Sequence, residues 1–128
     1  MSRSLVIDAS ALVDLLLGEP ASERIADRIE RSSLHAPAHI ELELLSAFGR
    51  IGRSGQLTSA EVDLRLRAAE SVPIHRHALD GLSAGAWRRR QSLRISDAFY
   101  VELADQLAVP LITTDLRLAR ATPRAEAI

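Results

Sequence analysis

Acidic residues follow two apolar segments that lie at opposite ends of the chain. Asp8 comes after Leu5-Val6-Ile7, and Asp115 comes after Leu111-Ile112-Thr113-Thr114. Aliphatic and β-branched residues of this kind predict short buried strands. In α/β proteins, ligands and chemistry lie beyond the carboxyl ends of parallel strands, so both carboxylates are expected at one edge of a sheet. The alternative for Asp8 is structural, because Asp8 or Ser10 would also cap the helix that follows.

A third acid, Asp97, stands near the start of the helix predicted over Ser96–Ala108, with Ser96 as its expected cap. Residues at positions i, i+4, i+7 and i+11 lie on one face of a helix. Here this face, which is predicted to point inward, carries Asp97, Val101, Ala104 and Ala108. A charged side chain on a buried face requires a partner or a bound ion. The alternative is that Asp97 stays at the rim and interacts with the helix dipole.

The helix predicted over Ile40–Arg53 carries two more candidates, Glu41 and Glu43. On a helical wheel Glu41 falls inside the apolar arc, and Glu43 falls at its polar border. A carboxylate that serves an open cleft fits the border, whereas wheel phase is least reliable in a first turn. Spacing alone does not choose between the two residues.

Carboxylates that converge need a cation. Two like charges ~4 Å apart repel by roughly 4 kcal/mol at an effective dielectric constant of about 20. A hard divalent ion such as Mg²⁺ or Mn²⁺ removes this repulsion and prefers oxygen ligands. Such an ion would activate water and neutralise the charge on a scissile phosphate. The acids therefore indicate metal-dependent phosphodiester chemistry.

The composition narrows the class of protein. The 128 residues suit one domain over 1–128, and a net charge of −1 gives no overall basic field for nucleic acid. All 16 basic residues are arginine, which sets aside P-loop enzymes, receiver domains and haloacid-dehalogenase-like phosphatases, since these need a lysine. The lack of cysteine excludes disulfides and thiolate metal sites. No apolar run approaches the ~20 residues of a membrane span, and no signal peptide is recognisable, which predicts a cytoplasmic protein.

Predicted strands and helices alternate along the chain. Further helices are expected over Ala11–Leu17, Ala21–Glu30, from Thr58 or Ser59 to Glu70, over Leu79–Arg90 and from Leu116. Weaker strand signals lie at His35–Pro37, at Val72–His75 and after Arg117. This alternation predicts an α/β fold with a small parallel sheet of four to five strands flanked by helices.

Four segments in their order resemble the PIN-domain proteins and, more narrowly, the VapC toxins of bacterial VapBC toxin–antitoxin modules. These segments are Val6–Leu12, Pro37–Glu43, Ser96–Tyr100 and Leu111–Asp115. The resemblance runs nearly end to end and implies a PIN-like fold. It also implies an endoribonuclease that depends on Mg²⁺ or Mn²⁺ and is inhibited by a cognate VapB-like antitoxin. A homodimer and a toxin–antitoxin hetero-oligomer are the assemblies it implies.

The same resemblance assigns site residues. The four acids of the family, as catalytic residues and metal ligands, fall in chain order on Asp8, Glu43, Asp97 and Asp115. Glu43 lies six residues after Pro37, as in the family, and is therefore favoured over Glu41 by the resemblance. Ser10 and Thr113 match supporting polar positions.

Arg88, Arg89 and Arg90, next to Trp87, are candidates for contact with RNA. Arginines pair with phosphate groups, and a tryptophan can stack on an unpaired base. The alternative is a solvated helix end that interacts with the dipole.

The histidines are predicted to be ordinary surface or edge residues, with His35 and His39 near the cleft. Five further aspartates are predicted to be solvated helix or loop residues: Asp14, Asp27, Asp63, Asp80 and Asp105. The alternative function belongs to another class of protein. It is a PIN-like binding module without nuclease activity, whose acidic pocket docks a basic partner peptide.

Overall fold

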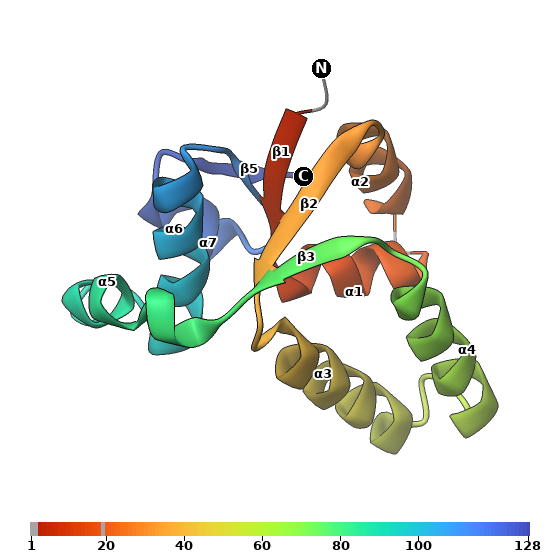
Figure 1. Cartoon of the computed structure of the whole chain (residues 1–128). Helices are drawn as coiled ribbons and strands as arrows, with labels where there is room; N and C mark the ends of the chain where they lie inside the picture. The colour runs from red at the N-terminus through yellow and green to blue at the C-terminus, as the bar shows by residue number, and fades with distance from the viewer. Residues whose placement is uncertain (1–2, 19) are drawn as a thin grey trace.

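A five-stranded parallel sheet forms the centre of the molecule (Figure 1). The structure is a computed structural model that describes residues 3–18 and 20–128. The strands lie in the order β3-β2-β1-β4-β5, with the bounds β1 Arg3–Ile7, β2 Ser32–Pro37, β3 Ile74–His77, β4 Leu111–Thr113 and β5 Ala125–Ala127. The predicted parallel α/β sheet is confirmed, including the weakly marked last strand.

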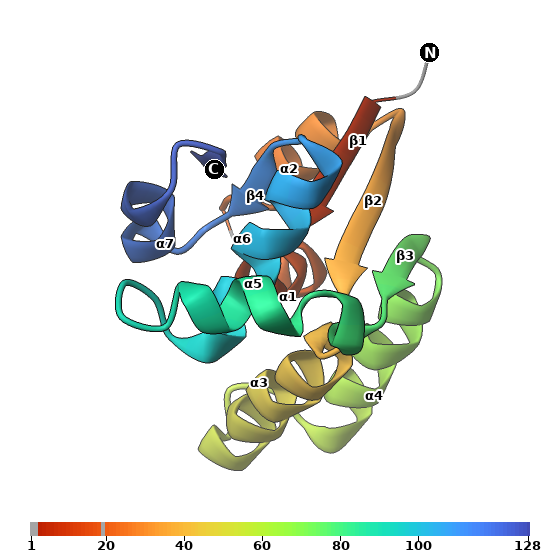
Figure 2. The same cartoon turned by 60° about the vertical axis from the view of Figure 1, so that its left-hand side comes forward.

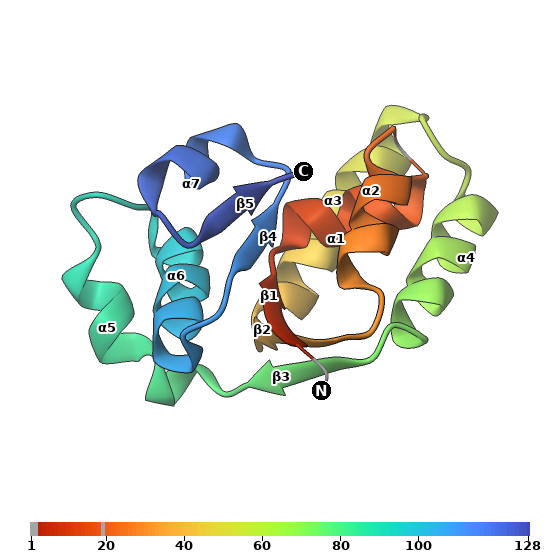
Figure 3. The same cartoon turned by 90° about the horizontal axis from the view of Figure 1, so that it is seen from above.

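Helices cover both faces of the sheet. Seen from above, α1 and α2 lie on one side of the strands, and α6 and α7 lie on the other (Figure 3). The helices are α1 Ala9–Leu17, α2 Ser22–Ile29, α3 Ile40–Ser54, α4 Ser59–Glu70, α5 Ser83–Arg88, α6 Ile95–Leu107 and α7 Leu116–Ala121. The short α5 packs against α6 (Figure 2). Across residues 3–18 and 20–128, none of these helices combines the length and apolar character needed to cross a membrane.

The order of the strands reverses between β1 and β4. From β1 the chain steps outward to β2 and β3, and it then returns to place β4 on the other side of β1. Val6 is in register with Leu111, and Ile7 is in register with Ile112. Clefts in α/β sheets form at the carboxyl ends of strands where the order reverses. The residues that follow β1 and β4 therefore stand at the position where this fold opens a cleft.

The central strand is buried from both sides. Leu5, Val6 and Ile7 are 1%, 0% and 0% exposed, as expected for a parallel strand with helices on both faces. This burial explains why the strand is an uninterrupted apolar run. It also fixes the register, so that the first polar residue after the run, Asp8, emerges at the end of the strand.

The helix predicted over Leu79–Arg90 was wrong as a single element. The structure has a 3₁₀ turn over Leu79–Gly81 and then α5. Leu82 lies between them with φ −109° and ψ −12°, still in the right-handed region but with a φ more extended than usual for a helix, and its side chain is buried in the core. Burial of this leucine therefore overrides the helical pattern that runs through the segment.

The prediction that Ser96 caps α6 was also wrong. The helix begins at Ile95, and Arg94 stands at the cap position without a capping side-chain hydrogen bond. Ala108 does not continue the buried stripe, because it ends the helix in the left-handed region at φ 55° and is exposed. Val101 and Ala104 are buried as predicted, and Asp97, for which a position at the rim was the alternative, is buried with them.

Candidate active site

Asp8 has two roles at the end of β1. One carboxylate oxygen, Oδ1, accepts hydrogen bonds from the backbone N–H of Ala11 at 2.9 Å and from the hydroxyl of Ser10 at 2.8 Å. The other, Oδ2, accepts from the hydroxyl of Thr113 at 2.6 Å. Asp8 therefore caps α1, as the structural alternative predicted, and also borders a cleft. The two interpretations are compatible because the cap occupies one side of the carboxylate.

Burial changes the acidity of Asp8. The side chain is almost removed from water, which raises its pKa to about 6 although the hydrogen bonds from Thr113, Ala11 and Ser10 act in the opposite direction. The nearby charge of Asp115 raises it further. A carboxylate in this situation is stabilised by any cation that enters the cleft.

Asp97 and Asp115 are joined by an arginine. The Nη2 atom of Arg117 lies 3.0 Å from Oδ2 of Asp97 and 3.1 Å from Oδ2 of Asp115. Arg94 adds a longer contact to Asp97 at 3.4 Å. Asp115 also caps α7, because its Oδ1 accepts from the backbone N–H groups of Arg117 and Leu118. The guanidinium of Arg117 supplies the positive charge that the paired acids require.

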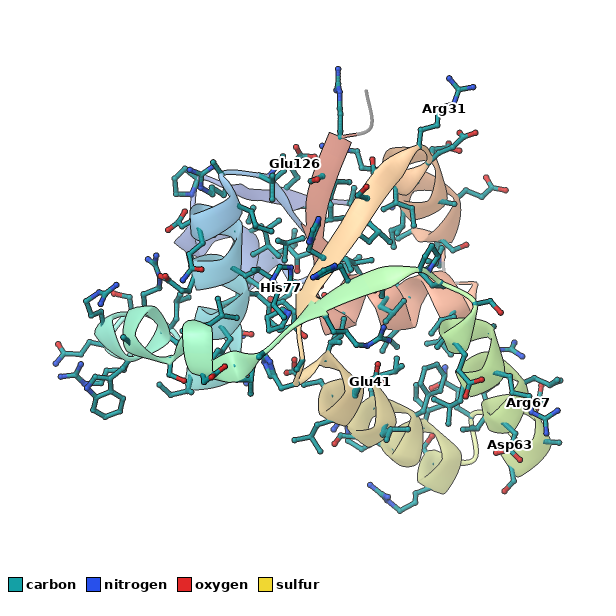
Figure 4. The ribbon with its side chains drawn as sticks, viewed as in Figure 1. Arg31, Glu41, Asp63, Arg67, His77 and Glu126 are labelled. Carbon is teal, nitrogen blue, oxygen red and sulfur yellow. The ribbon has the colours of Figure 1, made fainter. Side chains whose placement is uncertain are left out.

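The two glutamates of α3 point to different places. Glu43 lines the cleft, and its Oε1 accepts a hydrogen bond from the buried hydroxyl of Tyr100 at 2.7 Å. Burial and the charge of Glu43 raise the pKa of Tyr100 well above its usual range, which keeps the phenol protonated as the donor. Glu41, labelled near the start of α3 in Figure 4, is exposed. It pairs with Arg76 of β3. The geometry thus brings Glu43, and not Glu41, to the other acids.

These side chains line one open cleft of about 370 Å³. Its wall contains the four acids favoured by the resemblance, which come from different parts of the fold: Asp8 after β1, Glu43 on α3, Asp97 on α6 and Asp115 after β4. Ser10 is also in the wall, and Thr113 reaches it through its hydrogen bond to Asp8.

Sequence reasoning missed several cleft residues. Asp14 was predicted to be solvated, yet it lines the cleft together with Arg50, Arg94 and Tyr100. Asp14 lies in α1, so its position depends on how that helix runs along the cleft, which no local pattern reveals. Tyr100 had a weak signal, since it lies three residues after Asp97 and hence on the same side of a helix.

The donor set of the cleft suits a hard divalent cation. Carboxylate oxygens dominate it, and such ligands are preferred by Mg²⁺ and Mn²⁺. Within the described part of the chain, no three acidic or histidine side chains already meet in a geometry that could hold a metal ion. Arg117 occupies the space between two of the acids instead. The chemistry of the residues therefore fits such an ion, and an ion bound to Oδ2 of Asp97 or of Asp115 would compete with Arg117.

The other predicted candidates lie away from this cleft. Arg88 and Arg89 line a separate hollow of about 660 Å³ next to Arg124, and the side chain of Arg89 is paired with Glu102 and Asp105. The guanidinium of Arg90 lies 4.3 Å from the centre of the Trp87 ring.

Three histidines form a cluster on neighbouring strands. His35 of β2 lies with His75 and His77 of β3, with ring centroids 4.5–5.4 Å apart. Burial and the neighbouring imidazoles lower the pKa of His35 and of His77. His39 is separate and packs against Phe99 and Tyr100 beside Glu43.

Comparison with known proteins gives a consistent result. The PIN domain family matches residues 5–122. Ribonuclease VapC3 of Mycobacterium tuberculosis is 52% identical, with 98% of this chain and 93% of the relative covered. Ribonuclease VapC12 of the same organism is 35% identical, with 91% and 90% covered.

Two solved structures share the fold. PAE2754 from Pyrobaculum aerophilum has a TM-score of 0.72 at 23% identity, with 96% of this chain and 82% of that chain covered. VapC20 of Mycobacterium tuberculosis, described as a sarcin-ricin loop cleaving toxin, has a TM-score of 0.64 at 13% identity, with 91% and 94% covered. At these identities the likeness is one of fold alone.

Proposed function

The chain belongs to the VapC family of PIN-domain proteins, and we propose that it is the toxin of a VapBC module, an endoribonuclease that uses Mg²⁺ or Mn²⁺. The observation that carries the proposal is the cleft at the strand reversal, where four acids from separate elements line one wall. The curated relatives that cover nearly the whole chain are named ribonucleases, which supports RNA as the substrate.

The proposed metal ligands are Asp8, Glu43, Asp97 and Asp115. A bound divalent ion supplies activation of water and charge neutralisation at the phosphodiester. Ser10 and Thr113 hold the carboxylate of Asp8 in one orientation through its two oxygens. A fixed orientation matters because a catalytic group that is already in place loses no entropy when the substrate binds.

Positively charged side chains at the cleft would bind the phosphate groups of the RNA backbone. Arg50 and Arg94 belong to its wall, and arginine makes bidentate contacts with phosphate. Arg88 is exposed and lines the separate hollow, and it stays a predicted RNA contact outside the cleft. Arg89 and Arg90 remain predicted RNA contacts, although their guanidinium groups are engaged with acids and with Trp87.

A VapB-like antitoxin is the proposed inhibitor. The acids of the cleft already accept a guanidinium, that of Arg117, so an arginine from a bound peptide would satisfy the same groups. Such a peptide would compete with the metal ion for Asp97 and Asp115. The homodimer, the toxin–antitoxin hetero-oligomer and the cytoplasmic location stay predictions.

Cleavage of total cellular RNA by the purified chain, separated from any bound peptide, tests the proposal. We expect cleavage with Mn²⁺ or Mg²⁺, loss of cleavage with a chelator, and loss in Asp8→Asn and Glu43→Gln. Glu41→Gln is the matched control, since Glu41 lies outside the cleft, and it should retain activity. A wild-type chain that binds a basic peptide but never cleaves RNA would support the binding module instead.

A further inference from the structure

Two side chains contact the Glu43 carboxylate: the half-buried His39, which precedes α3, and the buried Tyr100 of α6. The hydroxyl of Tyr100 donates to Oε1 of Glu43 at 2.7 Å, and Tyr100 is only 1% exposed. Nε2 of His39 lies 3.5 Å from the same oxygen. The rings of His39 and Tyr100 pack on each other with centroids 5.0 Å apart. Both groups therefore meet at a single oxygen of one proposed ligand.

His39 also contacts the backbone beside another acid. Its Nε2 lies 3.0 Å from the carbonyl oxygen of Ser96, the residue before Asp97. A carbonyl only accepts hydrogen bonds, so Nε2 carries the proton and donates. The other ring nitrogen, Nδ1, is buried and has no hydrogen-bond partner among the described residues, so no acceptor is found there for a proton on Nδ1. This tautomer ties the start of α3 to the start of α6.

The geometry points to Tyr100 and His39 as positioning residues that fix Glu43 relative to Asp97 for the cation. This inference rests on the proposed function and names residues that act through Glu43. A glutamate has three rotatable bonds, so a free Glu43 would sample several positions in an open cleft. Tyr100 removes that freedom by a hydrogen bond from a ring packed in the core, and His39 fixes the spacing between the helices that carry the two acids.

A purely structural role for Tyr100 is the competing explanation. Loss of a buried hydroxyl would then lower stability without a specific effect on Glu43. Two measurements separate the explanations: the affinity of the RNA-free chain for Mn²⁺, and its dependence on the presence of the Glu43 carboxylate. Groups that hydrogen-bond to metal ligands typically change metal affinity or activity by about 10- to 100-fold when removed.

The first experiment is a double-mutant cycle between Tyr100→Phe and Glu43→Gln, read out by titration of the purified chain with Mn²⁺. We expect Tyr100→Phe to weaken Mn²⁺ binding by about 10-fold and to have no further effect when Glu43→Gln is present. Thr122→Val is the control, because Thr122 is also buried but does not line the cleft; it should leave Mn²⁺ affinity unchanged. An effect of equal size with and without the Glu43 carboxylate would overturn the inference.

The second experiment tests the donor on His39. Glutamine can place an N–H near the position of Nε2, whereas phenylalanine keeps only the ring. We expect His39→Gln to retain most of the Mn²⁺ affinity and His39→Phe to lose it, with both variants folded by circular dichroism. Equal affinities in the two variants would remove His39 from the inference.

The wild-type chain separates the two proposals. If it neither binds Mn²⁺ nor cleaves RNA, the proposed function fails and the inference fails with it. If it does both while Tyr100→Phe binds Mn²⁺ as tightly as the wild type, the inference alone is overturned.

Discussion

The hydroxyl of Thr113 lies 2.6 Å from Oδ2 of Asp8, so the end of β4 donates a hydrogen bond to the end of β1. The same oxygen of Thr113 accepts from the backbone N–H of Asp115 at 2.9 Å. A single buried hydroxyl thus connects the first and the fourth acid of the cleft.

Replacement of that hydroxyl should cost stability. In Thr113→Val, one oxygen of the buried Asp8 carboxylate and the N–H of Asp115 lose their partner, and an unsatisfied buried polar group costs about 1–3 kcal/mol. We expect a decrease of this size in the free energy of unfolding, measured with urea. Thr113→Ser keeps the hydroxyl and should recover most of the loss. A stable valine variant would mean that water replaces the hydroxyl.

The stability of the metal-free chain should depend on pH through Asp8. Burial raises the pKa of this group from 3.8 to about 6, so between these values the folded state binds more protons than the unfolded state. The free energy of unfolding should therefore fall as the pH rises from about 4 to about 6 and then level off. At about 1.4 kcal/mol for each pKa unit, the contribution is about 3 kcal/mol.

Asp8→Asn provides the control for this pH dependence. Asparagine keeps the cap of α1, because its side-chain oxygen can accept from the same N–H, but it carries no titrating group. Urea unfolding at a series of pH values should show the slope in the wild type and a much smaller slope in the variant. If both proteins have the same slope, another group causes it.

Arg117 should act against the metal ion. Its guanidinium pairs with Asp97 and Asp115, so a cation bound to Oδ2 of either acid would compete with it. We expect Arg117→Gln to bind Mn²⁺ several-fold more tightly than the wild type, measured by calorimetry. Arg120→Gln is the matched control, since Arg120 is exposed on the same helix and the change in charge is identical. Weaker Mn²⁺ binding by Arg117→Gln would show that the arginine organises the acids instead of competing for them.

Gly85 should not tolerate a side chain. A Cβ atom there would lie 2.0 Å from Cδ of Glu102, and Glu102 is buried and held by Arg89 and Gln106. Gly85→Ala should therefore lower the free energy of unfolding by about 1–3 kcal/mol, as overpacking does. Gly81→Ala, where a Cβ would meet no atom of the described residues within 4 Å, should change it by less than about 0.5 kcal/mol. Thermal unfolding of the two variants checks the difference.

The sequence predicts those parts of the site that depend on local patterns. Asp8 and Asp115 were predicted because an acid at the end of an apolar strand is visible in a few consecutive residues. Spacing alone did not choose between Glu41 and Glu43, and only the resemblance favoured Glu43. Glu41 pairs with Arg76, a residue of β3 that the helical wheel does not contain. Asp14 and Arg117 were missed for the same reason, because their partners and the cleft wall come from other elements.

In the fold, too, local patterns predict some features, whereas others depend on contacts with distant parts of the chain. Alternating strands and helices predicted the parallel sheet, whereas the break at Leu82 follows from burial in a core that the segment itself does not define.

The position of β1 in the middle of the sheet has a consequence for synthesis. The neighbours of β1 are β2 and β4. One edge of β1 therefore stays unpaired until Leu111 and Ile112 of β4 have been synthesised. Pairings between distant segments carry a large loop-closure cost and form late. A chain that stops before Asp115 would lack one wall of the cleft, so this site is complete only after both of its distant strands have been made.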